Sequence, residues 1–89
     1  MLIVSYDISD TKLRTRFAKM LKKEGAIRLQ LSVYEINNTQ RVMDNVMLRI
    51  NSVAKHFTGA DSVMIFDVAS VKVQKFGNAI HRDTPIVYL

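Results

Sequence analysis

The stretch "LIVSYDISDTKLRTRFAKMLKKEG", residues 2–25, places a strand directly before a helix. Residues 2–8 are rich in β-branched and aromatic side chains, which favour strands. Ser9 or Asp10 can accept hydrogen bonds from the free N–H groups at the start of a helix. The stretch therefore predicts a strand over 2–8 followed by a helix over about 10–24.

The expected helix has one apolar side and one basic side. Its apolar residues recur at helical spacing and predict a buried stripe of Leu13, Phe17, Met20 and Leu21. The glycine at position 25 is the residue type that most often ends a helix in the left-handed conformation. Five basic side chains lie away from this stripe and are expected to face outward: Lys12, Arg16, Lys19, Lys22 and Lys23.

The positive charge of the chain is concentrated around this helix. The net charge is +5, and the segment from Lys12 to Arg28 holds seven basic residues against Glu24 alone. That segment carries +6, so the rest of the chain sums to −1. A local block of positive charge favours phosphate backbones as partners. The alternative is a solvated helix face with no partner.

Residues 26–36, "AIRLQLSVYEI", alternate between apolar and polar side chains and predict one long strand. The apolar face of this strand is expected to hold Ile27, Leu29, Leu31 and Val33. The opposite face is expected to hold Arg28, Gln30, Ser32 and Tyr34.

A turn over 37–39 and a cap at Thr39 predict a second helix over about 40–56. Apolar residues repeat along it with the helical period, and Met43 and Met47 belong to this stripe. A methionine at helical spacing is more often part of the core than of a binding surface, so we expect both in the core.

The C-terminal third predicts further β structure. Residues 58–61 break the chain, residues 62–69 predict a third strand and residues 70–76 a fourth. A short β-type run, 86–89, follows the only proline and could pair with the sheet edge of a partner subunit.

The resulting order is strand, helix, strand, helix, strand, strand, because residues 37–39 are too few to form another strand. Two arrangements stay open. The second helix packs beside a β-α-β unit, or strands 26–36 and 62–68 flank that helix as the middle strands of a ferredoxin-like plan.

Length and composition predict a single domain over 1–89. A chain of 89 residues has a small core, yet 48% of its residues are hydrophobic. This balance suggests a homodimer that covers apolar surface, and a well-packed monomer is the alternative.

The absence of cysteine excludes disulfides and thiolate metal sites. No signal sequence and no apolar run of roughly 20 residues is present, so we expect a soluble cytoplasmic protein without membrane contact.

Asp7 is the candidate metal ligand, because it ends the first strand, where functional sites gather. Magnesium requires six oxygen ligands, and one aspartate supplies at most two, so the site improves if a dimer brings two copies of Asp7 together. The alternative is that Asp7 is an ordinary carboxylate at the entry of the helix, beside Asp10.

His56 and His81 lack metal-ligand spacing, and no phosphate loop, serine-hydrolase, zinc or RNP motif occurs.

Residues 1–36 resemble the small CRISPR-associated adaptation subunit, the Cas-two family. The hallmarks are a strand ending in Tyr-Asp-Ile, a basic helix with an Arg-x-Arg pair and an Arg-x-Gln-x-Ser-Val-aromatic strand. They are present as Tyr6-Asp7-Ile8, as Arg14 and Arg16, and as Arg28-Leu29-Gln30 with Ser32-Val33-Tyr34. The later "DSVMIF" segment (61–66) is also similar to the family, although Tyr34 stands where phenylalanine is common.

The resemblance implies an α+β, ferredoxin-like fold, with an antiparallel sheet and both helices on one of its faces. Strands 26–36 and 62–68 would then lie beside the first strand. The resemblance also implies a homodimer in which the last strand, "PIVYL" (85–89), adds to the sheet of the partner.

The resemblance further implies a metal-dependent endonuclease that acts on RNA or DNA, with Mg²⁺ held by one Asp7 from each subunit. It implies a catalytic set of Asp7, Tyr6, Arg14 and Arg16. It also implies a nucleic-acid-binding set of Lys12, Arg14, Arg16, Lys19, Arg28 and Tyr34. The partners implied are double-stranded DNA, single-stranded RNA and dimers of the CRISPR integrase (Cas one), which flank a central dimer in the spacer-integration complex.

Three other functions stay open. A single carboxylate pair is a small catalytic set, and the basic block equally suits a non-catalytic scaffold that spans a DNA duplex. A toxin-like messenger RNA endonuclease outside CRISPR, or a regulatory ferredoxin-like domain that binds a ligand, would not associate with an integrase. Gene neighbours separate these hypotheses, because a CRISPR array beside an integrase gene identifies the system.

Overall fold

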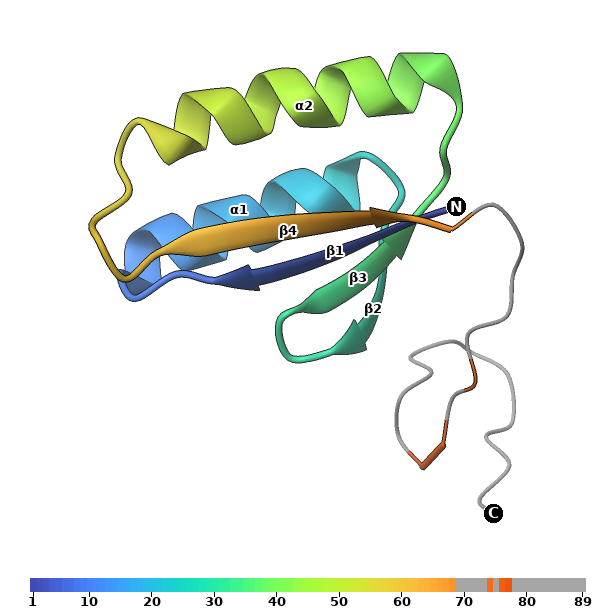
Figure 1. Cartoon of the computed structure of the whole chain (residues 1–89), viewed down its shortest axis with the longest axis horizontal. Coiled ribbons are helices and arrows are strands. Elements are labelled where there is room, and N and C mark those ends of the chain that lie inside the picture. Colours follow the sequence, from blue (N-terminus) through green and yellow to red (C-terminus); the bar gives the residue numbers. More distant parts are fainter. Residues whose placement is uncertain (69–73, 75, 78–89) are drawn as a thin grey trace.

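The structure is a computed structural model that describes residues 1–68, 74 and 76–77 (Figure 1). Its elements are β1 (Leu2–Asp7), α1 (Thr11–Lys23), β2 (Ile27–Gln30), β3 (Val33–Ile36), α2 (Gln40–Ala54) and β4 (Ser62–Asp67). This β-α-β-β-α-β order is that of a ferredoxin-like fold and confirms the expected fold class. No helix in this part of the chain is long and apolar enough to span a membrane.

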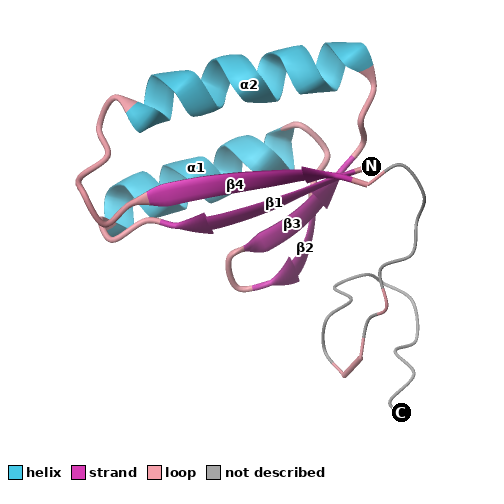
Figure 2. Ribbon diagram, in the orientation of Figure 1, coloured by secondary structure: helices cyan, strands magenta, loops and turns pink. Residues whose placement is uncertain are grey.

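The four described strands form one antiparallel sheet in the order β2-β3-β1-β4. Both helices lie on the same face of this sheet (Figures 1 and 2). β1 occupies a central position and pairs with β3 and β4, so the strand expected beside it over 62–68 is present as β4. Because strands alternate their side chains, one face of the sheet packs against the helices, and no described helix or strand covers the other, which we call the open face.

The prediction of one long strand over 26–36 is wrong. Leu31 and Ser32 form a turn, and the run folds back on itself as the β2–β3 hairpin. The missing fourth strand of the ferredoxin-like plan therefore lies inside this run. A two-residue turn leaves the period-2 alternation uninterrupted, and no Gly, Pro, Asn or Asp marks it. The pattern consequently contains no sign of the reversal.

The hairpin also changes the two predicted faces of this segment. Leu31 is 77% exposed at the turn, whereas Tyr34 is only 1% exposed and lies in the core. A register shift between Arg28 and Gln30 adds a residue to β2 relative to β3. Such a bulge re-aims side chains along a strand, so the simple alternation of faces does not hold here.

The hydrophobic core lies between the sheet and the two helices. Its buried members are Leu2, Val4, Tyr6, Ile8, Leu13, Phe17, Leu21, Tyr34, Ile36 and Val46. The apolar stripe predicted for the first helix is therefore confirmed. Met43 packs against this core as expected. Met47 is 42% exposed, so its assignment to the core is wrong, and Val46 is the buried residue of α2.

Local hydrogen bonds fix both ends of α1. Asp10 caps its start, with Oδ2 accepting from the N–H of Leu13 at 2.8 Å. At its end, the N–H of Gly25 donates to the carbonyl of Lys22 and the N–H of Ala26 to that of Leu21, each at 3.0 Å. This is a Schellman motif, which requires the positive φ of 88° at Gly25. The helix therefore stops where the hairpin must begin.

The remaining boundaries agree with prediction to within a few residues. The second helix, expected over 40–56, ends at Ala54, and its cap at Thr39 accepts from the N–H of Val42 at 3.4 Å. The break at 58–61 is present as a loop. The strand expected over 70–76 lies outside the described residues except for Gln74 and Phe76, and the run over 86–89 lies outside them entirely.

Candidate functional site

A pocket of about 580 Å³ lies between the end of β1, one side of α1 and the β2–β3 hairpin. We call it the basic pocket, because the described residues that line it include four cationic side chains and one acid, Asp7. The lining residues are Tyr6, Asp7, Ile8, Arg14, Thr15, Ala18, Lys19, Lys22, Arg28, Leu31, Ser32 and Tyr34. A concave wall with an excess of positive charge attracts anionic groups such as phosphates.

Six of the eight predicted site residues line the basic pocket: Tyr6, Asp7, Arg14, Lys19, Arg28 and Tyr34. Lys12 and Arg16 do not, and both are exposed on the outer side of α1. With Lys19 and Lys23 they recur at i, i+4, i+7 and i+11 and form one row along the helix. We call Lys12, Arg16, Lys19 and Lys23 the basic stripe, and Lys19 belongs to both features.

Tyr6 and Tyr34 form the aromatic wall of the basic pocket. Their rings stack at a centroid distance of 6.2 Å, and Phe17 packs edge-on against Tyr6 at 4.8 Å. Burial first, and the neighbouring Tyr34 second, raise the pKa of Tyr6 to about 12, although Arg28 and Arg14 act in the opposite direction. Tyr6 is therefore a neutral hydrogen-bonding group at physiological pH and does not supply a phenolate.

The guanidinium of Arg14 is held against the loop between β1 and α1. Its Nη1 donates to the carbonyl oxygens of Ile8 at 3.0 Å and Ser9 at 3.5 Å, and its Nη2 donates to the Thr11 hydroxyl at 3.3 Å. An arginine has five N–H donors, and these three bonds leave two of them for a ligand. Arg14 thus presents its charge to the pocket in a fixed orientation.

Arg28 differs from Arg14 because part of its guanidinium lacks a partner. Its Nε is buried and makes no hydrogen bond. A buried donor without an acceptor costs about 1–3 kcal/mol, and the cost is larger for a charged group. Arg28 comes from β2 and lines the pocket opposite α1.

Asp7 is exposed at the end of β1. Within the described residues, no group of three or more His, Cys, Asp or Glu side chains could hold a metal ion. The other polar side chains that line the pocket with Asp7 are cations and hydroxyls, which do not add carboxylate ligands. The described residues of one chain therefore do not fit a magnesium site.

Asp61 is a polar residue of this region that the sequence did not single out. Its carboxylate accepts four hydrogen bonds, two from Ser9 and two from Thr58, and so joins the β1–α1 loop to the α2–β4 loop. The hydrogen bonds from the backbone N–H of Ser9, the backbone N–H of Thr58 and the Ser9 hydroxyl, in that order, lower the pKa of Asp61 to about 2. Because Ser9 and Asp61 are 52 residues apart, no local pattern predicts the contact.

Comparisons with known proteins place the chain among small CRISPR-associated proteins. A family model described as CRISPR associated protein Cas2 matches residues 1–76. The crystal structure of a hypothetical protein TT1823 from Thermus thermophilus is similar at 30% identity, with a TM-score of 0.70 over 90% of this chain and 95% of that chain. No similar sequence was found among curated proteins.

A second solved structure supports the fold. A crystal structure described as cas2 has a TM-score of 0.72 over 99% of this chain and 94% of that chain, at 21% identity. At this identity the likeness concerns the fold alone, and it agrees with the α+β topology and the two helices on one face.

Proposed function

The chain belongs to the CRISPR associated protein Cas2 family, and we propose on this basis that it is a CRISPR adaptation subunit that binds duplex DNA. The observation that carries the proposal is the basic surface of α1, where the basic pocket and the basic stripe adjoin at Lys19. Phosphate contacts by Lys and Arg supply most of the affinity of proteins that bind DNA without reading its sequence.

The dimensions of the basic stripe suit a duplex backbone. Lys12 and Lys23 are eleven residues apart, which corresponds to roughly 16 Å along a helix axis, or about five base pairs of DNA. All four stripe side chains are exposed, so they can reach phosphates without a change in the fold. Arg14 and Arg28 line the basic pocket, where their guanidinium N–H groups would donate to the oxygens of a phosphate.

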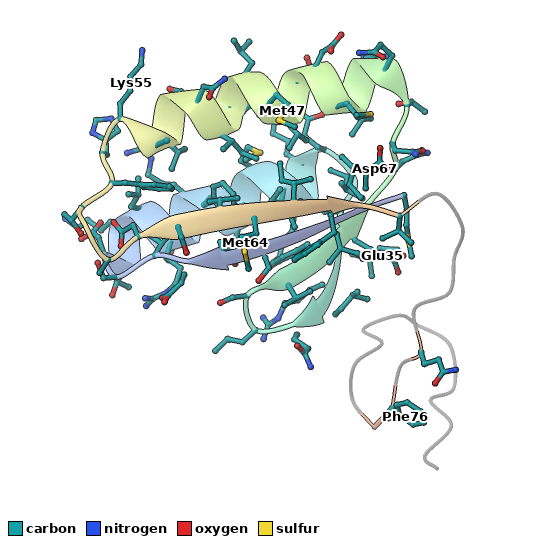
Figure 3. All side chains as sticks on the ribbon, in the orientation of Figure 1. Glu35, Met47, Lys55, Met64, Asp67 and Phe76 are labelled. Carbon is teal, nitrogen blue, oxygen red and sulfur yellow. The ribbon has the colours of Figure 1, made fainter. Side chains whose placement is uncertain are left out.

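A homodimer is part of the proposal, and the open face of the sheet supports it. Met64 and Phe66 of β4 are 55% and 50% exposed there, opposite Ser5 and Ile3 of β1 in register. Figure 3 shows Met64 on the side of β4 that is turned away from α2. An apolar row on a sheet face without helices is suited to a second copy of the chain.

The dimer would give the subunit two basic surfaces related by a two-fold axis. Such a platform can lie along a duplex and hold a dimer of the CRISPR integrase at each end. This arrangement requires no catalysis by the subunit itself, because spacing and phosphate binding are sufficient.

A magnesium-dependent endonuclease is the second candidate, and one observation favours it. Asp7 lines the same pocket as Tyr6, Arg14 and Arg28, so a carboxylate and phosphate-binding cations adjoin. Since one chain does not complete a metal site, this candidate depends on a dimer that brings two copies of Asp7 together. Arg16, the remaining member of the predicted catalytic set, lies outside the pocket.

Two variants separate the scaffold from the nuclease. We expect Asp7→Ala to leave spacer integration by the purified subunit and integrase intact, and Arg14→Ala with Arg16→Ala to abolish it. Loss of integration with Asp7→Ala, together with loss of magnesium-dependent cleavage of RNA or duplex DNA, would instead favour the enzyme. Messenger RNA cleavage without any duplex binding or integrase association would favour a toxin-like nuclease.

A further inference from the structure

We propose that Asp61 is a positioning residue for nucleic-acid binding, which holds the guanidinium of Arg14 in place through the β1–α1 loop. The inference rests on the proposed function to the extent that Arg14 is taken to contact phosphate. It adds a residue from the other half of the chain to a site that otherwise comes from residues 6–34.

The first link runs from Asp61 to Ser9. Oδ1 of Asp61 accepts from the backbone N–H of Ser9 at 2.9 Å and from its hydroxyl at 2.8 Å. Oδ2 accepts from the N–H of Thr58 at 3.0 Å and from its hydroxyl at 3.3 Å, which holds the carboxylate itself in place. The loops that follow β1 and precede β4 meet at one end of the sheet (Figure 1).

The second link runs from the same loop to Arg14. The carbonyl oxygens of Ile8 and Ser9 accept from Nη1 of Arg14 at 3.0 and 3.5 Å. Ser9 therefore bonds Asp61 through its N–H and hydroxyl, and it bonds Arg14 through its carbonyl. A shift of the loop at Ser9 relative to β4 therefore displaces two of the three acceptors that orient the guanidinium, and the Thr11 hydroxyl is the third.

The other hydrogen bonds of this loop are local to α1. Asp10 accepts from the N–H of Leu13 through its side chain and from the N–H of Arg14 through its carbonyl, as any helix start would. These bonds move with the helix and do not tie the loop to the sheet. The bonds between Ser9 and Asp61 span 52 residues and therefore connect the loop to the other half of the chain.

The first experiment measures the Arg14 side chain without any ligand. Nitrogen-15 NMR of the guanidinium groups reports how fast each arginine head group rotates, and hydrogen bonds slow this rotation. We expect Asp61→Ala to accelerate the rotation of Arg14 at least about threefold and to leave that of Arg16, which is exposed on the same helix, unchanged. Thr58→Val is the matched control, because it removes one bond to Asp61 and keeps both bonds to Ser9.

Two outcomes of this experiment would overturn the proposal. Unchanged rotation of Arg14 in the Asp61→Ala protein would show that Asp61 does not position it. Equal acceleration by Thr58→Val would assign the effect to a general loosening of the loop and not to the contacts with Ser9.

The second experiment is a double-mutant cycle on duplex DNA affinity. We expect Asp61→Ala to weaken binding of a blunt DNA duplex by about threefold to tenfold in the parent protein and not to weaken it further in the Arg14→Ala protein. Additive losses would overturn the proposal, because Asp61 would then act by another route. If the parent protein binds no duplex, the proposed function fails, while the NMR experiment still decides whether Asp61 positions Arg14.

Discussion

At the scale of single residues, the two arginines of the Arg-x-Arg pair have different surroundings. Arg14 is half-buried and bonded to the carbonyls of Ile8 and Ser9, whereas Arg16 is exposed and belongs to the basic stripe. A substitution of Arg14 therefore removes loop contacts as well as a charge. Arg16 and Lys19 are the cleaner positions at which to test phosphate binding.

Tyr6 gives a pH-dependent prediction at this scale. Because the pKa of Tyr6 is raised to about 12 from the ordinary 10.0, the folded state holds this proton more tightly than the unfolded state does. The contribution of Tyr6 to stability is therefore complete below pH 10 and is lost as the pH rises toward about 12. Ultraviolet titration of the parent protein should show one tyrosine that ionises late.

Tyr6→Phe is the control for this titration. The variant should lack the late ionisation step, and its urea-unfolding free energy should fall less between pH 10 and 12 than that of the parent. A late step that persists in Tyr6→Phe would assign the raised pKa to another tyrosine and contradict the described packing.

The site residues were predictable to the extent that they lie close together in the sequence. Tyr6, Asp7 and Arg14 follow one another through a strand end and a helix start, and the family resemblance added Arg28 and Tyr34. Asp61 was not predictable, because its contact with Ser9 depends on the packing of β4 against β1.

At the scale of secondary structure, α1 was predictable because three independent signals agree along it. The apolar stripe, the cap at Asp10 and the stop at Gly25 all specify the same helix. The β2–β3 hairpin was not predictable from its residues, because a turn at Leu31 and Ser32 preserves the alternation of a continuous strand. The position of the reversal depends on how β2 and β3 pair, and a period-2 pattern does not show where a strand folds back on itself.

The stop of α1 gives a prediction for stability. Gly25 has a φ of +88°, which an L side chain adopts at a cost of about 1–2 kcal/mol, although a Cβ there meets no atom within 4 Å. We expect Gly25→Ala to lower the free energy of unfolding in urea by about this amount. Gly59→Ala is the matched control, since that position is equally open and has no positive φ. Equal effects of the two substitutions would contradict a specific role for the Schellman motif.

At the scale of the whole molecule, helices cover one face of the sheet, and no described element covers the open face. We expect sedimentation velocity to show a dimer, and Phe66→Glu to weaken dimerisation at least about tenfold, because it places a charge on the open face. Leu48→Glu is the control, since Leu48 is 70% exposed on α2 and lies away from that face. A monomeric parent protein, or a dimer that tolerates Phe66→Glu, would contradict the proposed interface.

The central claim is that the basic surface of α1 binds the phosphates of duplex DNA, and the salt dependence of the affinity tests it most directly. Each lost phosphate contact should make the slope of log affinity against log salt concentration shallower by about 0.9. For Arg16→Ala with Lys19→Ala, the slope is predicted to be shallower by about 2 for each subunit on the duplex. Arg41→Ala with Arg49→Ala removes equal charge from exposed positions of α2 and should leave the slope unchanged. An identical slope for the parent and the Arg16–Lys19 double variant would contradict the claim.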